Sequence, residues 1–116
     1  YMNINANALT GSLPTELGKL TKLTVLGVGS NSFTGMLPTE LGKVTDLEKF
    51  YAYSNRFTGP LPTEYGMWSG LKIFSVYENN VMGTIPSELG SWKALKTFAV
   101  NNNNLSGTLP TELGKL

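Results

Sequence analysis

Apolar and polar positions along the chain follow a 24-residue pattern that returns from one end to the other. The run L-x-x-L-x-L-x-x-N, which begins at Leu23 and ends at Asn31, recurs in each later cycle with conservative replacements. The alternation around x-L-x-L predicts a short, half-buried strand in every cycle, because successive strand side chains point to opposite faces. Since one cycle cannot bury its own apolar face, we expect the strands to stack as a parallel sheet, about 4.8 Å apart.

Further positions keep the same 24-residue interval, and no insertion breaks it. They are the prolines Pro14, Pro38, Pro62, Pro86 and Pro110, the glycines Gly11, Gly35, Gly59, Gly83 and Gly107, and the glutamates Glu16, Glu40, Glu64, Glu88 and Glu112. The glycine before x-L-P indicates a positive φ or a close approach of the backbone, and the proline favours an extended segment on the side away from the strands. The chain thus divides into units of approximately 1–20 (partial), 21–44, 45–68, 69–92 and 93–116.

This unit resembles the leucine-rich repeat, and more narrowly its plant-type version, which continues after the Asn as x-L-x-G-x-[IL]-P-x-x-L-G-x-L. The resemblance covers the whole chain; Tyr65, Trp68 and Trp92 stand at leucine positions, and Met82 stands at a Ser/Thr position. It implies a single domain, residues 1–116, folded as a right-handed repeat solenoid with one parallel β-sheet of short strands over five repeats. The convex side would carry 3-10 and polyproline-like segments. Receptor-like ectodomains of plants and related algal proteins are built in this way.

The inward positions of each unit form the predicted core. In one unit they are Leu37, Leu41, Val44, Leu47, Phe50, Ala52 and Phe57. Full burial of each large apolar side chain contributes roughly 1.5–3 kcal/mol. The repeated asparagines, which we call the Asn ladder, are Asn7, Asn31, Asn55, Asn79 and Asn103. A buried amide must be hydrogen-bonded, so we expect each one to bond turn backbone in its own and the next unit, as a structural element.

Composition narrows the classes of function. The chain has no histidine and no cysteine, which excludes a His-activated nucleophile, a thiolate, a disulfide framework and an ordinary zinc or copper site. The glutamate row follows from the repeat and lies on a convex flank, so we expect no enzyme activity, no metal and no cofactor. A net charge of +1, with Lys and Glu interleaved, provides no basic stripe for nucleic acid. Apolar runs are far shorter than the roughly 18 residues of a membrane span, so we expect no direct membrane insertion of this segment.

The outward strand positions are not fixed by the repeat, and they carry the candidate site. In register they form one row of Asn3, Gly27, Tyr51, Ser75 and Ala99 and a second row of Asn5, Gly29, Tyr53, Tyr77 and Asn101. Three tyrosines would therefore meet on adjacent strands, solvent-exposed, beside a shelf of two glycines. Exposed aromatic clusters are common anchors of binding surfaces, although tyrosine also suits strands in general. The predicted ligand-binding residues are Tyr51, Tyr53, Tyr77, Lys49, Glu78, Gly27, Gly29, Asn5 and Asn101, and the ligand class is a protein, peptide or glycan.

Two rows of hydroxyl residues favour a rival function. One row is Thr15, Thr39, Thr63, Ser87 and Thr111, and the other is Thr10, Thr34, Thr58 and Ser106. Such rows would match a polysaccharide, mineral or ice surface, although hydroxyls before a glutamate also solvate turns. The alternative hypothesis is therefore a structural or adhesive solenoid that self-assembles end to end or binds an extended surface.

The outermost units are predicted to expose apolar side chains. These are Met2 and Ile4 at one end and Leu105, Leu109, Leu113 and Leu116 at the other. Because repeat arrays need polar terminal caps, we expect the chain to be a segment of a longer array, with neighbouring repeats or copies of the chain at both ends. Asn104 begins the acceptor sequence N-L-S, which would be glycosylated in a secreted protein. The resemblance implies an extracellular or cell-surface location.

Overall fold

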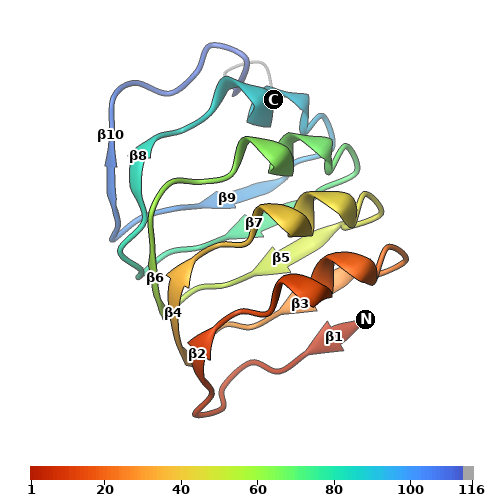
Figure 1. The fold of residues 1–116 in the computed structure, drawn as a ribbon. Helices are drawn as coiled ribbons and strands as arrows, with labels where there is room; N and C mark the ends of the chain where they lie inside the picture. The colour runs from red at the N-terminus through yellow and green to blue at the C-terminus, as the bar shows by residue number, and fades with distance from the viewer. Residues whose placement is uncertain (114–116) are drawn as a thin grey trace.

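The computed structural model describes residues 1–113 as a solenoid of stacked coils. One side of the coils carries a five-stranded parallel sheet, which we call the strand face (Figure 1). Its strands, in spatial and chain order, are β1 (Met2–Asn3), β3 (Val25–Gly27), β5 (Lys49–Tyr51), β7 (Ile73–Ser75) and β9 (Thr97–Ala99). Leu26 pairs with Phe50 and Phe50 with Phe74, which confirms both the predicted sheet and its register from one repeat to the next.

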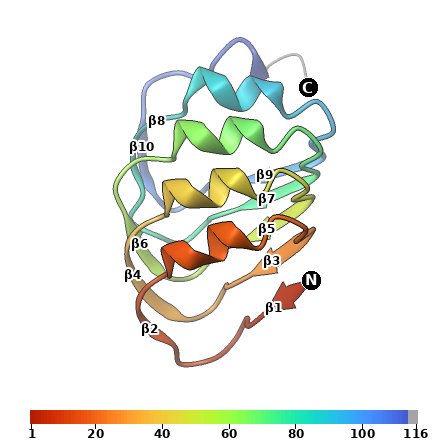
Figure 2. The same ribbon diagram turned by 45° about the vertical axis from the view of Figure 1, so that its right-hand side comes forward.

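Short 3-10 helices form the convex side, and Figure 2 shows them stacked above one another. They are η1 (Thr15–Lys19), η2 (Thr39–Lys43), η3 (Thr63–Met67) and η4 (Ser87–Ser91). A proline precedes each helix in an extended conformation; Pro38, for example, has φ −66° and ψ 129°. Adjacent helices pack closely because a glycine lies at the contact: a Cβ atom on Gly42 would lie 2.7 Å from the carbonyl oxygen of Glu64.

A third side, the flank, carries two further parallel sheets. One contains β2 (Thr10–Ser12), β4 (Ser32–Met36) and β6 (Arg56–Thr58), and the other contains β8 (Met82–Thr84) and β10 (Asn104–Ser106). Pairing here departs from the register of the repeat, since Thr10 lies opposite Ser32 rather than opposite its counterpart Thr34. The expectation of a single sheet misses the flank, because a glycine within or directly after each strand, such as Gly35 at φ +77°, hides the strand pattern in the sequence.

A column of apolar side chains runs through the centre of the solenoid. All seven inward positions predicted between Leu37 and Phe57 are buried, with exposed fractions of at most 2%. Tyr65, Trp68 and Trp92, the replacements for leucine, are fully buried as well. Each donates a hydrogen bond to a backbone carbonyl of the preceding coil: Tyr65 Oη to Pro38 at 2.9 Å, Trp68 Nε1 to Leu41 at 3.0 Å and Trp92 Nε1 to Tyr65 at 2.8 Å. Burial raises the pKa of the Tyr65 phenol well above its usual range.

The Asn ladder is structural, as predicted, but it reaches in the opposite direction. Asn79 Nδ2 donates to carbonyls of its own turn and to Ala52 in the preceding coil at 2.9 Å, and its Oδ1 accepts the N–H of Phe57 at 3.0 Å. The expected contact with the next unit is therefore wrong. The reason is that the carbonyl of Ala52, one residue beyond the end of β5, points towards the following coil. The chain of that coil has already turned there, so the Asn79 amide takes the place of a backbone N–H.

Apolar side chains lie on the outermost coils. Met2 and Ile4 are partly buried, Leu20 is 41% exposed and Leu109 is 63% exposed. Shallow cavities lie at both ends, one lined partly by Met2 and Leu23 and the other partly by Phe98 and Leu109. Leu116, which was expected to share this surface, lies outside the described residues. Within residues 1–113, no helix has the length and apolar character to cross a membrane.

Candidate binding face on the parallel sheet

The structure brings Tyr51, Tyr53 and Tyr77 together into one cluster on the strand face. Tyr51 ends β5, Tyr53 follows two residues later, and Tyr77 occupies the matching position after β7. The rings of Tyr53 and Tyr77 are parallel, at an interplanar angle of 5° and a centroid distance of 5.0 Å, and Tyr51 meets Tyr53 edge-on at 6.4 Å. All three side chains are partly buried rather than fully exposed, because the rings cover one another. The cluster is therefore preorganised.

The two glycines do not form the open shelf that the sequence suggested. Both are buried, since a Cβ atom on Gly29 would lie 2.7 Å from ring atoms of Tyr53, and one on Gly27 would lie 2.9 Å from the side-chain oxygen of Asn5. Asn5 Oδ1 also accepts a hydrogen bond from the Gly29 N–H at 2.6 Å. Side chains of neighbouring coils thus cover the two glycines. The small glycines make space for the Tyr53 ring and the Asn5 amide, and no open surface is left there for a ligand.

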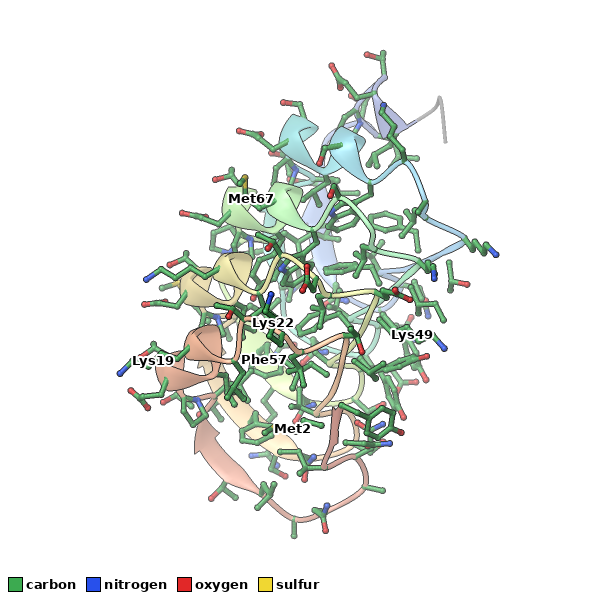
Figure 3. All side chains as sticks on the ribbon, turned by 90° about the vertical axis from the view of Figure 1, so that its right-hand side faces the viewer. Met2, Lys19, Lys22, Lys49, Phe57 and Met67 are labelled. Atoms are coloured by element: carbon green, nitrogen blue, oxygen red, sulfur yellow. The ribbon has the colours of Figure 1, made fainter. Side chains whose placement is uncertain are left out.

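Charged residues lie along the edge where the strands begin. Lys72 Nζ donates to Glu48 Oε2 at 2.7 Å, and this hydrogen bond holds the pKa of the Glu48 carboxyl below its usual range. Lys49, the first residue of β5, is partly buried beside this pair. In Figure 3, Lys49 lies on the opposite side of the molecule from Lys19 and Met67, which project from the convex side. The strand face is thus bordered by a mostly basic edge.

The opposite edge carries residues in an unusual backbone conformation, which the sequence did not reveal. Ala6, Ser30, Ser54, Glu78 and Asn102 all have positive φ, between 51° and 57°. Of the residue types in this row, only asparagine favours the left-handed region. Asn102 is therefore the single position at which the sequence carries a signal for this conformation. The conformation turns the chain inward after each strand and places these side chains at the rim. Ser54 Oγ donates to Glu78 Oε2 at 2.6 Å, and Glu78 is exposed.

The last predicted site residue, Asn101, lies next to the tyrosine cluster. It occupies the position of Tyr77 in the following coil, and its carbonyl oxygen accepts the N–H of Glu78 at 3.0 Å. Asn101 is exposed, whereas Ser75, the last residue of β7, is buried. The strand face thus changes from bulky aromatic to small polar side chains between two adjacent coils.

The two hydroxyl rows differ in their surroundings. On the convex side the hydroxyls of Thr15, Thr39, Thr63 and Ser87 each donate to the carboxylate of the glutamate that follows, at 3.1–3.3 Å. Thr10, Thr34 and Thr58 are exposed on the flank, where Arg56 is the one charged residue within the five described strands. Asn104, the glycosylation candidate, is exposed at the start of β10 on this flank. In the described part of the chain, no group of three or more carboxylates is placed to hold a metal ion.

Comparisons with known proteins agree with this architecture. Residues 94–116 match the family described as Leucine Rich Repeat, and no curated protein sequence matches the chain. The ectodomain of the Arabidopsis thaliana receptor kinase GASSHO1/SCHENGEN3, solved with CASPARIAN STRIP INTEGRITY FACTOR 2, is similar with a TM-score of 0.94 and 31% identity. That match covers 97% of this chain and 13% of that chain.

Two further structures resemble the chain. The Arabidopsis receptor kinase HAESA, solved with the peptide hormone IDA and the co-receptor SERK1, has a TM-score of 0.94 and 31% identity over 98% of this chain and 19% of that chain. A plant ice-binding protein has a TM-score of 0.91 and 27% identity over 97% of this chain and 37% of that chain. The chain thus spans at most 37% of the length of these three structures, and the comparisons indicate no enzyme family.

Proposed function

This chain belongs to the plant-type leucine-rich repeat proteins, and from that premise we propose that its strand face binds a peptide or protein partner outside the cell, without catalysis. The observation that supports the proposal best is the preorganised cluster of Tyr51, Tyr53 and Tyr77. Rigid aromatic side chains provide large contact area at low entropic cost and are enriched among residues that dominate binding energy. A glycan is the other ligand class that such rings accommodate.

The strand face also differs from coil to coil, whereas the convex side keeps one recurring pair of polar residues in every coil. Each complete convex segment repeats a hydroxyl paired with its own glutamate, so the same chemistry is presented four times. On the strand face, by contrast, small polar, aromatic and charged side chains succeed one another. A surface that discriminates among partners needs such variation, because specificity depends on differences between contacts.

Selection from a displayed library of random peptides tests the proposal. Peptides enriched on the unmodified chain should lose binding to a variant in which Tyr51, Tyr53 and Tyr77 are all replaced by serine. A matched variant with Thr15, Thr39 and Thr63 replaced by serine changes three residues on the convex side and should keep binding. Absence of any enriched peptide, or peptides that bind the tyrosine variant equally well, would contradict the proposal.

A second candidate function is adsorption of the flank to an extended neutral surface such as ice, mineral or polysaccharide. It is favoured by the hydroxyls of Thr10, Thr34 and Thr58, which are spaced by one coil on exposed strands nearly free of charge, and by the similarity to a plant ice-binding protein. The test is thermal hysteresis, the difference between the melting and freezing temperatures of an ice crystal in a solution of the chain. Thr34→Lys should abolish it, whereas Thr39→Lys on the convex side should not; no hysteresis in the unmodified chain would exclude ice.

We also propose that further coils, or copies of the chain, cover the two ends in the working molecule. The proposal is supported by the apolar side chains of the outermost coils, such as Leu20 and Leu109, which occupy positions that interior coils bury. Polar end units are the general requirement of repeat arrays in water.

A further inference from the structure

The stack of tyrosine rings on the strand face ends at Tyr77. The ring of Tyr53 lies over Gly29 in the preceding coil, since a Cβ atom on Gly29 would come within 2.7 Å of that ring. The ring of Tyr77 is parallel to that of Tyr53, at a centroid distance of 5.0 Å and an interplanar angle of 5°. The second face of Tyr77 is therefore turned towards the following coil. Within residues 1–113, Tyr53 is the one aromatic neighbour of Tyr77.

The backbone repeats at the following coil, but the ring does not. Between the coils of Tyr53 and Tyr77, the N–H of Ser54 donates to the Tyr77 carbonyl oxygen at 2.9 Å. One coil further, the N–H of Glu78 donates to the Asn101 carbonyl oxygen at 3.0 Å. Asn101 thus stands to Tyr77 as Tyr77 stands to Tyr53, and it is exposed and carries a short side chain without a ring. The place that a third ring would occupy in the stack is open.

Small side chains lie beside this open place. In the register of the sheet, Tyr51 pairs with Ser75 and Ser75 pairs with Ala99. The coil of Tyr53 therefore carries a second tyrosine on the neighbouring row, whereas the two coils that follow carry a serine and an alanine there. Ser75 is buried and Ala99 is partly buried. Because both side chains are short, the open place has room for a group as wide as an indole ring.

A flat, uncharged ring is the group that continues such a stack. Offset parallel rings attract each other at centroid distances of about 4.5–7 Å, a range that includes the spacing of Tyr53 and Tyr77. We propose that the open face of Tyr77 is a subsite for an aromatic side chain of the peptide partner, which takes the place of the ring that the following coil lacks. This inference rests on the proposed function and adds the chemistry of the group that is recognised.

Nuclear magnetic resonance of the full chain tests the subsite with the peptide acetyl-Gly-Trp-Gly-amide as probe. The expected result is a saturable upfield shift of the Tyr77 ring protons, together with shifts of Asn101 resonances, because a stacked ring shields its neighbour. The matched peptide acetyl-Gly-Leu-Gly-amide is apolar without a ring and should cause no such shift. Absence of shifts with the tryptophan peptide, or equal shifts with the leucine peptide, would overturn the inference. Shifts with methyl β-glucoside alone would assign the ring face to a glycan and would overturn it as well.

Variants test whether the ring face itself binds the probe. Tyr77→Leu removes the ring, and Asn101→Leu covers its open face with an aliphatic side chain. Each should weaken the tryptophan peptide by between about twofold and tenfold, the range for one aromatic pair. Thr97→Leu adds the same side chain at an exposed position at the start of β9, away from Tyr77, and should leave the affinity unchanged. Full affinity in Asn101→Leu, or equal weakening by Thr97→Leu, would overturn the subsite.

The library selection distinguishes failure of this inference from failure of the proposed function. Peptides that require the three tyrosines but tolerate replacement of every aromatic residue would leave the binding face standing and remove the aromatic subsite. Peptides that do not require the tyrosines would remove both. The inference needs enriched peptides that carry an aromatic residue and lose affinity with Asn101→Leu.

Discussion

The side-chain nitrogen of Asn55 lies 3.0 Å from the carbonyl oxygen of Val28, in the preceding coil. The side-chain oxygen of the same residue accepts the N–H of Phe33 at 3.0 Å. Asn55→Ala would take the acceptor away from the Phe33 N–H and leave the Val28 carbonyl with the Asn31 amide alone, so we expect the free energy of unfolding to fall by about 1–3 kcal/mol. Denaturant unfolding measures the change, and Asn80→Ala at an exposed position is the control. Equal midpoints for the two variants would show that another group satisfies the turn.

Stacking of the convex side depends on close backbone contact at the glycines. A Cβ atom on Gly42 would lie 2.7 Å from the Glu64 carbonyl oxygen, whereas one on Gly70 would meet nothing within 4 Å. Gly42→Ala should therefore destabilise the fold by about 1–3 kcal/mol, the usual cost of overpacking. Gly70→Ala should be neutral or stabilising by up to about 1 kcal/mol, since it restricts the unfolded chain. Thermal melts of both variants measure the difference. Equal melting temperatures would contradict the close contact between Gly42 and the Glu64 backbone.

The ion pair between Lys72 and Glu48 should make the stability of the fold depend on pH. The hydrogen bond from Lys72 is the main cause that lowers the pKa of Glu48, and Lys49 contributes less. A carboxyl with a lowered folded-state pKa stabilises the fold above its unfolded pKa, and this contribution disappears as the pH falls through the folded value. Titration of the Glu48 carboxyl carbon should show the pKa rising in Lys72→Met and rising less in Lys49→Met. An identical titration in Lys72→Met would mean that the pair does not persist in solution.

Apolar side chains at both ends predict the behaviour of the isolated 116-residue chain. Leu20 and Leu109 are 41% and 63% exposed in positions that interior coils bury. We expect the chain to associate, or to unfold partially at its outermost coils, as concentration rises. Analytical sedimentation measures this directly. A monomer that melts cooperatively at high concentration would refute the expectation of covered ends.

Much of the fold could be predicted because the repeat period fixes which positions point inward. The strand register, the core column and the proximity of Tyr51, Tyr53 and Tyr77 follow from that period. The flank could not be predicted in the same way, because its strands pair out of step with the repeat and each strand contains or adjoins a glycine at positive φ. Period alone does not state which residues of two successive coils lie opposite each other after a turn.

The directions of the side chains could not be predicted from the sequence either. The sequence placed Gly29 and Tyr53 on one row but did not show that the ring covers the glycine. It likewise placed Thr39 on a regular row but did not show that its hydroxyl donates to Glu40. Rotamers depend on packing and hydrogen bonds between coils, so these details emerge only with three-dimensional coordinates.

We expect the strand face, rather than the flank or the convex side, to bind the partner. Calorimetric titration of one library-selected peptide against three variants tests it most directly. The variant with Tyr51, Tyr53 and Tyr77 replaced by serine should bind at least about 100-fold more weakly, given the weight of central aromatic anchors. Thr34→Lys on the flank and Glu40→Gln on the convex side should bind like the unmodified chain. Unchanged affinity in the tyrosine variant, with loss in either of the others, would contradict the account.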